Sequence, residues 1–256
     1  MKSKHFINLT LFMTGANLKK EISQYYLNYL WWILEPVLDM LIFYLVFGIM
    51  LNRGTPDFVA FLLVGSSTWL WFSKCVNNSA LSIYQEKALL QQIYVPKIFF
   101  PLSNVLQNSA KQLVVTLLLL VFLCLYGAPV SAVWLALPIL MAVQFLLICG
   151  CAFVSSAVVP FFPDLRFLIS AGLHLVFFAS GIFYSLESVV LPRHMFLAYL
   201  NPMAGLIKNY RLVLMSGQWP QWGYLLYVLC LSLFLCAFAT WLLKRFDPVY
   251  PRILCE

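Results

Sequence analysis

Charged residues are scarce in this chain. Only 10% of its 256 residues are Asp, Glu, Lys or Arg, whereas soluble globular domains carry about 25%. Apolar and aromatic residues make up 63% of the sequence, and the mean hydropathy is +0.89. A chain of this length cannot bury such an excess in one soluble core. The composition therefore excludes an ordinary soluble domain and predicts a membrane protein.

Motifs for nucleotide binding and for common catalysis are also missing. The sequence has no GxxxxGK[ST] loop, no dinucleotide-binding glycine fingerprint and no HExxH pair. Cys149 and Cys151 are close together, but their spacing is not CxxC and no histidine lies near them, which favours small packing residues over a metal or redox pair. We expect no cofactor or metal in this chain, so any ATP and magnesium that its function requires must be bound by another chain.

The sequence shows no secretory signal peptide. Its first ~26 residues are mixed and polar, without a compact apolar stretch followed by a small-residue cleavage site. We therefore expect the first membrane span to direct insertion. The net charge of +7 comes from basic residues beside apolar runs, which favours membrane orientation over nucleic-acid binding.

Six apolar runs reach the ~17–25 residues that a helix needs to cross a bilayer. They are predicted near 30–51, 58–78, 100–126, 132–159, 167–186 and 220–243. The segments between them contain no soluble domain, low-complexity linker or repeat. The sequence thus predicts an all-α membrane protein with six transmembrane helices, forming a single transmembrane domain over residues 1–256.

Basic residues are distributed unequally between the two sides that this topology defines. If the N-terminus is cytoplasmic, the cytoplasmic side holds Lys2, Lys4, Lys19, Lys20, Lys87, Lys97, Arg166, Lys244, Arg245 and Arg252. The opposite side holds Arg53, Arg193, Lys208 and Arg211. Lysine and arginine are enriched in cytoplasmic loops, so both termini are predicted to be cytoplasmic.

Residues 1–29 are predicted to form an amphipathic helix on the membrane surface. The apolar residues that recur near a 3.6-residue period are Ile7, Leu11, Leu18, Ile22 and Tyr25. Residues 79–99 are the most polar segment between spans on the cytoplasmic side, and they are rich in helix-forming residues. Such a segment is either a short helix offered to a soluble partner or an ordinary solvated connector.

Residues 187–219 are long for an external loop and yet apolar. The break at Asn201–Pro202 and the short apolar stretches around it predict half-helices that re-enter the outer leaflet, with an interfacial loop as the alternative.

Ionisable residues inside membrane spans cost free energy, so each of them needs a partner or a functional reason. Glu35 and Asp39 lie on one face of the first span, either as a functional acid pair or, for Glu35, as an acid at a helix N-terminus beside Pro36. Lys111 is a candidate partner for Asp39. It shares a helix face with Asn104, Gln107 and Asn108, which predicts either channel lining or hydrogen bonds between helices. His174 and Gln144 are interpreted as packing residues.

Several local sequences resemble one family, the type-2 ATP-binding-cassette exporter permeases for bacterial O-antigen, capsule and teichoic-acid polymers. YLWWILEPVLDMLIFYLVFG at 29–48 is similar to the entry into that family's first span, and QQIYVPKIFFPL at 91–102 to the exit from its cytoplasmic coupling helix. FFPDLRFL at 161–168 resembles its turn between the fourth and fifth spans. SGIFYSLESVVLP and NPMAGLIKNYRLVLMSG, at 180–192 and 201–217, resemble its external re-entrant hairpin.

The resemblance implies a homodimer in the bacterial inner membrane, with two copies of a separate cytoplasmic ATPase and a polyprenyl-linked polysaccharide as cargo. The coupling helix that contacts the ATPase would include Ile83, Glu86, Lys87 and Leu90. The aromatic residues expected to line the substrate path are Tyr29, Trp31, Trp32, Phe183 and Tyr184. Asp39 and Lys111 are further candidates for this path.

Two other functional classes compete with an exporter permease. An intramembrane transferase could use Glu35, Asp39 or His174, but these residues are scattered and no nucleophile or metal motif accompanies them. An ion-driven transporter predicts paired broken helices in two related halves, and no such repeat is visible. We therefore expect a non-catalytic transport subunit. The resemblance favours O-antigen as the expected cargo, with capsular polysaccharide or teichoic acid as alternatives.

Overall fold

A computed structural model describes residues 3–24, 30–50, 57–87, 95–189 and 191–250. These residues form helices and turns, with no strand among them. The elements are α1 (Ser3–Gln24), α2 (Leu30–Phe43), the π-helical η1 (Tyr44–Met50), α3 (Phe58–Ala80), α4 (Ser82–Gln85), α6 (Phe99–Tyr126), the 3-10 helix η2 (Ala132–Ala136), α7 (Leu137–Val158), α8 (Leu165–Ala179), α9 (Leu186–Val189), η3 (Pro192–His194), α10 (Met195–Leu200), α11 (Pro202–Leu214) and α12 (Trp222–Arg245).

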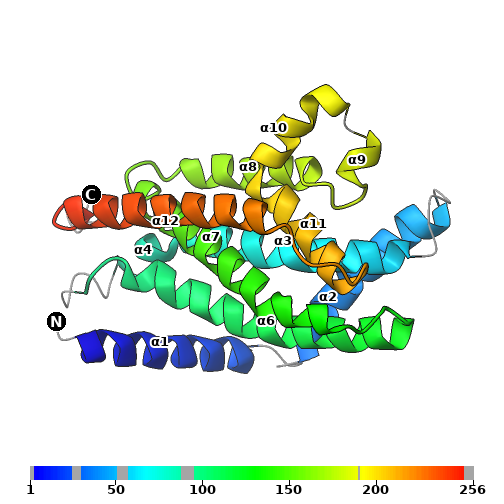
Figure 1. The fold of residues 1–256 in the computed structure, drawn as a ribbon. Coiled ribbons are helices and arrows are strands. Elements are labelled where there is room, and N and C mark those ends of the chain that lie inside the picture. Colours follow the sequence, from blue (N-terminus) through cyan, green and yellow to red (C-terminus); the bar gives the residue numbers. More distant parts are fainter. Residues whose placement is uncertain (1–2, 25–29, 51–56, 88–94, 190, 251–256) are drawn as a thin grey trace.

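Four helices in the described part of the chain are long and apolar enough to cross a membrane. They span Phe58–Ala80, Phe99–Tyr126, Ala132–Val158 and Trp222–Arg245, close to four of the predicted runs. They run along a shared axis, and α7 packs against α12, α3 and α6 (Figure 1). Gly150 lets α7 approach α12 closely, because a Cβ there would lie 2.7 Å from Leu235 Cβ of α12. The Cys149–Cys151 stretch thus serves helix packing.

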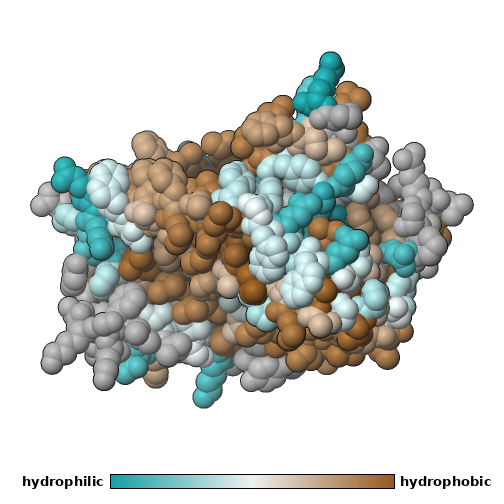
Figure 2. All heavy atoms as spheres, viewed as in Figure 1, coloured by the Kyte–Doolittle hydropathy of each residue, from teal (hydrophilic) through white to brown (hydrophobic). Residues whose placement is uncertain are grey.

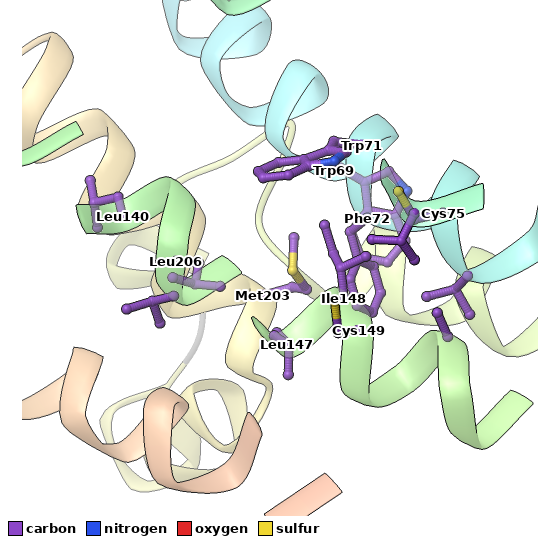
Figure 3. Close-up of a cluster of buried hydrophobic side chains, with 14 of the residues drawn as sticks. Trp69, Trp71, Phe72, Cys75, Leu140, Leu147, Ile148, Cys149, Met203 and Leu206 are labelled. Carbon is purple, nitrogen blue, oxygen red and sulfur yellow. The ribbon is translucent and has the colours of Figure 1, made fainter. Parts of the chain in front are cut away.

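The core lies where α3, α7 and α11 meet. Figure 3 shows Trp69, Trp71, Phe72 and Cys75 of α3 facing side chains of α7 and α11. The α7 and α11 residues of this cluster are Leu140, Leu147, Ile148, Cys149, Met203 and Leu206, all buried. By contrast, the outer faces of α6 and α12 expose large apolar side chains such as Leu125 and Phe234. This arrangement suits a bundle whose surface meets lipid.

The predicted first and fifth spans differ from the helices observed. Residues 30–50 form α2 followed by a π-helical turn, so the α-helical part is only 14 residues long. The span predicted at 167–186 is α8, which ends at Ala179 after 15 residues. The chain turns at Gly181, whose φ of +65° is a conformation that favours glycine. Hydropathy could not reveal this end because the residues after the turn are still apolar.

Polar residues gather at the two ends of the bundle. The start of α1, α4 and the end of α12 lie at one end, while α9 and α10 project near the other (Figure 1). Figure 2 shows hydrophilic side chains at both regions and a hydrophobic area between them on this face. α1 packs against α6; its predicted position at the membrane surface stays a prediction.

Two local sequence signals determine where α11 begins and where α6 ends. The Asn201 side chain accepts a hydrogen bond from Met203 N at 3.1 Å, and Pro202 follows it, so α11 begins with an N-cap and a proline in its first turn. α6 ends at Gly127, in the left-handed region with a φ of +89°. The break at Asn201–Pro202 expected from the sequence is therefore a boundary between two short helices, α10 and α11.

Candidate functional site

A groove between α3 and α8 combines aromatic rings with hydroxyl groups. Its volume is about 210 Å³. The residues that line it are Ser66, Trp69, Leu70, Ser73, Leu173, His174 and Phe177. Serine and tryptophan share this face because residues 66, 69, 70 and 73 of α3 recur at helical spacing. Apolar walls with a few polar groups are typical of a ligand site.

The aromatic side of this groove continues toward the C-terminal end of α8. The rings of Trp69 and Phe177 have centroids 5.8 Å apart, and those of Phe177 and Phe183 lie 5.1 Å apart at an angle of 88°. Phe178 extends the row and is 62% exposed. Edge-to-face contacts of this kind hold the rings in fixed orientations. The result is a rigid aromatic surface that runs from Trp69 across the last turn of α8 to the turn after it.

His174 belongs to the groove and is exposed, so it does not fill the packed interior expected from its apolar neighbours. Its Nδ1 lies 2.9 Å from Ser170 O. A carbonyl oxygen can only accept, so this bond places a proton on Nδ1 and leaves Nε2 of a neutral ring as an acceptor. The side chain therefore offers the groove a polar atom with a fixed direction.

A second pocket lies beside α9, α10 and α11, and charged side chains contribute to its lining. Its volume is about 290 Å³. Its lining is Phe61, Ser180, Gly181, Ser185, Leu186, Glu187, Tyr199, Ala204, Lys208, Arg211, Leu212, Met215 and Ser216. We call it the outer pocket.

Arg211 forms the inner wall of the outer pocket. Its guanidinium donates to the carbonyl oxygens of Gly181 (2.8 Å) and Ile182 (2.9 Å), and through Nε and Nη2 to Phe61 O. Hydrogen bonds to a charged group are stronger than neutral ones. One side chain of α11 thus fastens the start of α3 to the turn that follows α8.

Glu187, Tyr199 and Lys208 form a closed polar triad in the same pocket. Lys208 Nζ lies 2.6 Å from Glu187 Oε1, Tyr199 donates to that oxygen at 2.5 Å, and Lys208 donates to Tyr199 Oη at 2.9 Å. Partial burial opposes ionisation of Glu187, but the hydrogen bonds from Lys208 and Tyr199 prevail and lower its pKa to about 2. The triad ties α9 and α10 to α11.

Polar side chains in the bundle interior bond between helices. Gln144 of α7 donates to Thr68 O at 2.8 Å, and Gln112 of α6 donates to Ser67 Oγ at 3.2 Å. Asn104 Nδ2 donates to Asn78 O at 3.3 Å. Part of the polar face predicted on the third span therefore serves helix association, and Gln144 packs as expected.

Two of the predicted path residues lie together in the described structure. Phe183 is half-buried and packs on Phe177, and Tyr184 next to it donates to Phe178 O at 2.8 Å. Lys111 is half-buried on a different element, α6. Tyr29 lies outside the described residues, as do the side chains of Trp31, Trp32 and Asp39. The roles of all seven stay predictions.

The predicted coupling residues follow α3 directly. α4 is a single turn that contains Ile83, which is fully buried. Glu86 and Lys87 are half-buried where this described stretch ends, and Leu90 lies beyond it. A helix is confirmed only over Ser82–Gln85. Contact with an ATPase stays a prediction.

Several contacts were not predicted from the sequence. Glu35 forms an ion pair with Lys74 of α3 at 2.6 Å. This ion pair explains an acid within the apolar α2 more directly than the predicted position of Glu35 at a helix N-terminus does. The groove, the triad and the Arg211 contacts were also missed. A signal for Arg211 did exist, because a cation inside the apolar stretch AGLIKNYRLVLM needs a polar partner. The partners were backbone carbonyls, which no sequence pattern marks.

Comparison with known proteins connects this geometry to transport. No group of three or more metal-ligating side chains occurs among the described residues. The chain is 28% identical over 214 residues to the O-antigen export system permease protein RfbA of Klebsiella pneumoniae, covering 83% of this chain and 82% of that one. RfbA of Myxococcus xanthus is also 28% identical, over 215 residues, with 83% and 82% covered. The polysialic acid transport protein KpsM of Escherichia coli is 26% identical over 203 residues, 78% of each chain. Residues 13–215 match the family model described as ABC-2 type transporter, and the chain belongs to this family of membrane transport proteins.

Proposed function

We propose that this chain is the membrane-spanning permease of an ATP-driven exporter that moves a lipid-linked polysaccharide across the bacterial inner membrane. O-antigen is the favoured cargo, and capsular polysaccharide or teichoic acid is the alternative. The observation that carries the proposal is the similarity to O-antigen export permeases over 83% of the chain. The similarity to a capsule-type transporter is lower and covers less of the chain.

The membrane arrangement completes the proposal. α2 with η1 and α8 are two further spans beside the four long helices, and α9–α11 form a re-entrant hairpin on the periplasmic side. Both termini are cytoplasmic. Two copies of the chain enclose the path, and two ATPase subunits hold the ATP and magnesium below it.

The α3–α8 groove supports a sugar path. Aromatic rings bind sugars through their faces without strict demands on the sequence of the polymer, and Ser66, Ser73 and His174 supply hydroxyl and imidazole groups for hydrogen bonds. Exposed Leu175 and Phe178 on α8 leave an apolar surface that a second copy covers. Trp31, Trp32 and Tyr29 extend the path at its cytoplasmic entrance.

The test is export in cells and in reconstituted vesicles. Removing the chain should abolish surface polymer while lipid-linked polymer accumulates inside, and restoring the chain together with its ATPase should reverse both effects. An ATPase variant unable to hydrolyse ATP is the control and should not restore export. Loss of polymer synthesis itself would point instead to a transferase, and export without any ATPase would contradict the proposal.

A further inference from the structure

The chain folds back on itself after α12. Residues 246–250 pass over the cytoplasmic end of α7, where Tyr250 is fully buried and its hydroxyl donates to Ala157 O at 3.0 Å. We call residues 246–250 the return segment. This segment does not fray into solvent, because Tyr250 at its end is among the largest fully buried side chains of the described residues.

Aromatic contacts attach the return segment to the turn between α7 and α8. The ring of Phe161 has its centroid 5.3 Å from the rings of both Phe246 and Tyr250, at angles of 73° and 61°. Edge-to-face packing on two rings at once fixes the position of Phe161. The return segment therefore holds the end of α12, the end of α7 and the α7–α8 turn together.

An ion pair joins this unit to the segment before α6. Lys97 Nζ lies 3.5 Å from a carboxylate oxygen of Asp247, and the two side chains are only 2% and 20% exposed. Removing two charges from water costs free energy, and this cost largely offsets the attraction between them. Apolar residues of similar size at these positions would therefore stabilise the fold equally well. The pair is better explained by the position it imposes than by stability.

Lys97 occupies a mechanically important place. It follows the cytoplasmic segment 79–96 and comes just before α6, with Val95 and Phe99 buried on either side of it. If the ATPase moves the segment before Lys97, this residue is one point where the movement enters the bundle, in addition to the buried Ile83 of α4. Its partner Asp247 belongs to the return segment, which already holds α7 and α12.

We propose that the return segment is a positioning strut, in which Asp247 and Tyr250 transmit the movement of the coupling segment through Lys97 to α7 and α12. This inference rests on the proposed function, because it presumes an ATPase that acts on residues 79–96. The strut contacts neither ATP nor the polymer. Its effect is measured as polymer exported per ATP hydrolysed.

The experiment uses the full chain purified with its ATPase and reconstituted in vesicles with lipid-linked polymer. The variants are Lys97→Met, Asp247→Asn, the double Lys97→Met/Asp247→Asn, and Tyr250→Phe. For each variant we would measure chain abundance, bound ATPase, ATP hydrolysis and export. Export per ATP should fall about fivefold or more, the lower end of coupling between distinct protein sites, while the ATPase stays bound.

The double variant separates positioning from simple stability. Each single variant removes one charge of the buried ion pair and lowers abundance, whereas the double variant removes both charges together. Abundance should therefore recover in the double variant while export per ATP stays low. Recovery of both together would overturn the proposal and leave a stabilising contact only. Lys244→Gln and Arg245→Gln remove exposed cations at the end of α12 and serve as controls.

Failure of the proposed function has a different signature. A wild-type chain that binds no ATPase, or that exports nothing when ATP is supplied, would remove the basis for both proposals. A wild-type complex that exports, with variants that export equally well per ATP, would remove the strut alone.

Discussion

The guanidinium of Arg211 lies over the ring of Phe61, 3.3 Å from its centroid, and also donates to the backbone carbonyl of the same residue at 3.2 Å. Arginine suits both contacts because its planar group stacks on a ring while its edge donates hydrogen bonds. The start of α3 is therefore fixed to α11 through side chain and backbone together.

Replacing Arg211 by lysine should destabilise the protein despite keeping the charge. Lysine lacks the planar guanidinium that reaches the carbonyls of Phe61, Gly181 and Ile182. These carbonyls would lose their hydrogen bonds to a charged group, which should lower the unfolding free energy by about 2–4 kcal/mol. Thermal unfolding in detergent would measure this. Arg193→Lys, at an exposed arginine, is the matched control, and an equal melting temperature for both variants would contradict the assignment.

Gly65→Ala should reproduce part of the Arg211 effect. An added Cβ would lie 2.5 Å from Arg211 Nη2 and must displace the guanidinium from its carbonyls. Because both changes act on the same contacts, the double variant Gly65→Ala/Arg211→Lys should be less destabilised than the sum of the two single variants. Gly172→Ala, where no atom lies within 4 Å of the added Cβ, is the control. Strictly additive melting shifts would show that the sites are independent.

Acid should selectively weaken the hairpin through Glu187. Its pKa of about 2 in the folded protein lies below the ordinary 4.5, so the triad stabilises the fold fully above pH 4.5 and loses that contribution as the pH falls toward 2. The melting temperature of the wild type should exceed that of Glu187→Gln at neutral pH, and the gap should close between pH 4.5 and 2. The side chain is half exposed, which keeps the gap small.

The same pH series on Asp164→Asn provides the comparison for Glu187, because Asp164 is an exposed acid in the α7–α8 turn. A gap for Glu187→Gln that is constant across the acidic range would show that the carboxylate contributes nothing as an ion.

Replacing Glu86 and Lys87 together by alanine should uncouple the chain from its ATPase. Both residues are half-buried at the end of the described stretch after α4, so the change should leave membrane insertion intact while ATP-dependent export falls. Insertion and export would be measured on the same membranes. Normal export by the double variant would remove these residues from the coupling surface.

The long spans could be predicted from the sequence because their signal is local. Runs of apolar residues at 58–78, 100–126, 132–159 and 220–243 correspond to four long helices, and the ends differ by a few residues at most. The end of α8 could not be predicted in this way, because Gly181 and Ile182 continue the apolar run while the backbone turns. Hydropathy measures the preference of a residue for water or for an apolar environment. It contains no information on the backbone dihedral angle φ, so a turn at a glycine with positive φ cannot be recognised from it.

The candidate site was harder to predict from the sequence, because the residues that form it are far apart along the chain. Trp69 and Phe177 line one groove although more than a hundred residues separate them. Phe183 was identified through family resemblance, and it proved to be the outer end of the aromatic row. Arg211 was missed because its partners are carbonyl groups, which every residue carries and which only the fold brings together.

The shortness of α8 has a physical consequence for a polar cargo. Its 15 residues extend for about 22 Å, less than the ~30 Å of hydrocarbon in a typical bilayer. Beside it, the outer pocket presents carboxylate, ammonium and hydroxyl groups. In the proposed membrane arrangement, water can follow these groups inward, and a sugar leaving the proposed path would regain its hydration before it reaches the level of the outer headgroups. The dehydrated part of the proposed route would then be shorter than the membrane is thick.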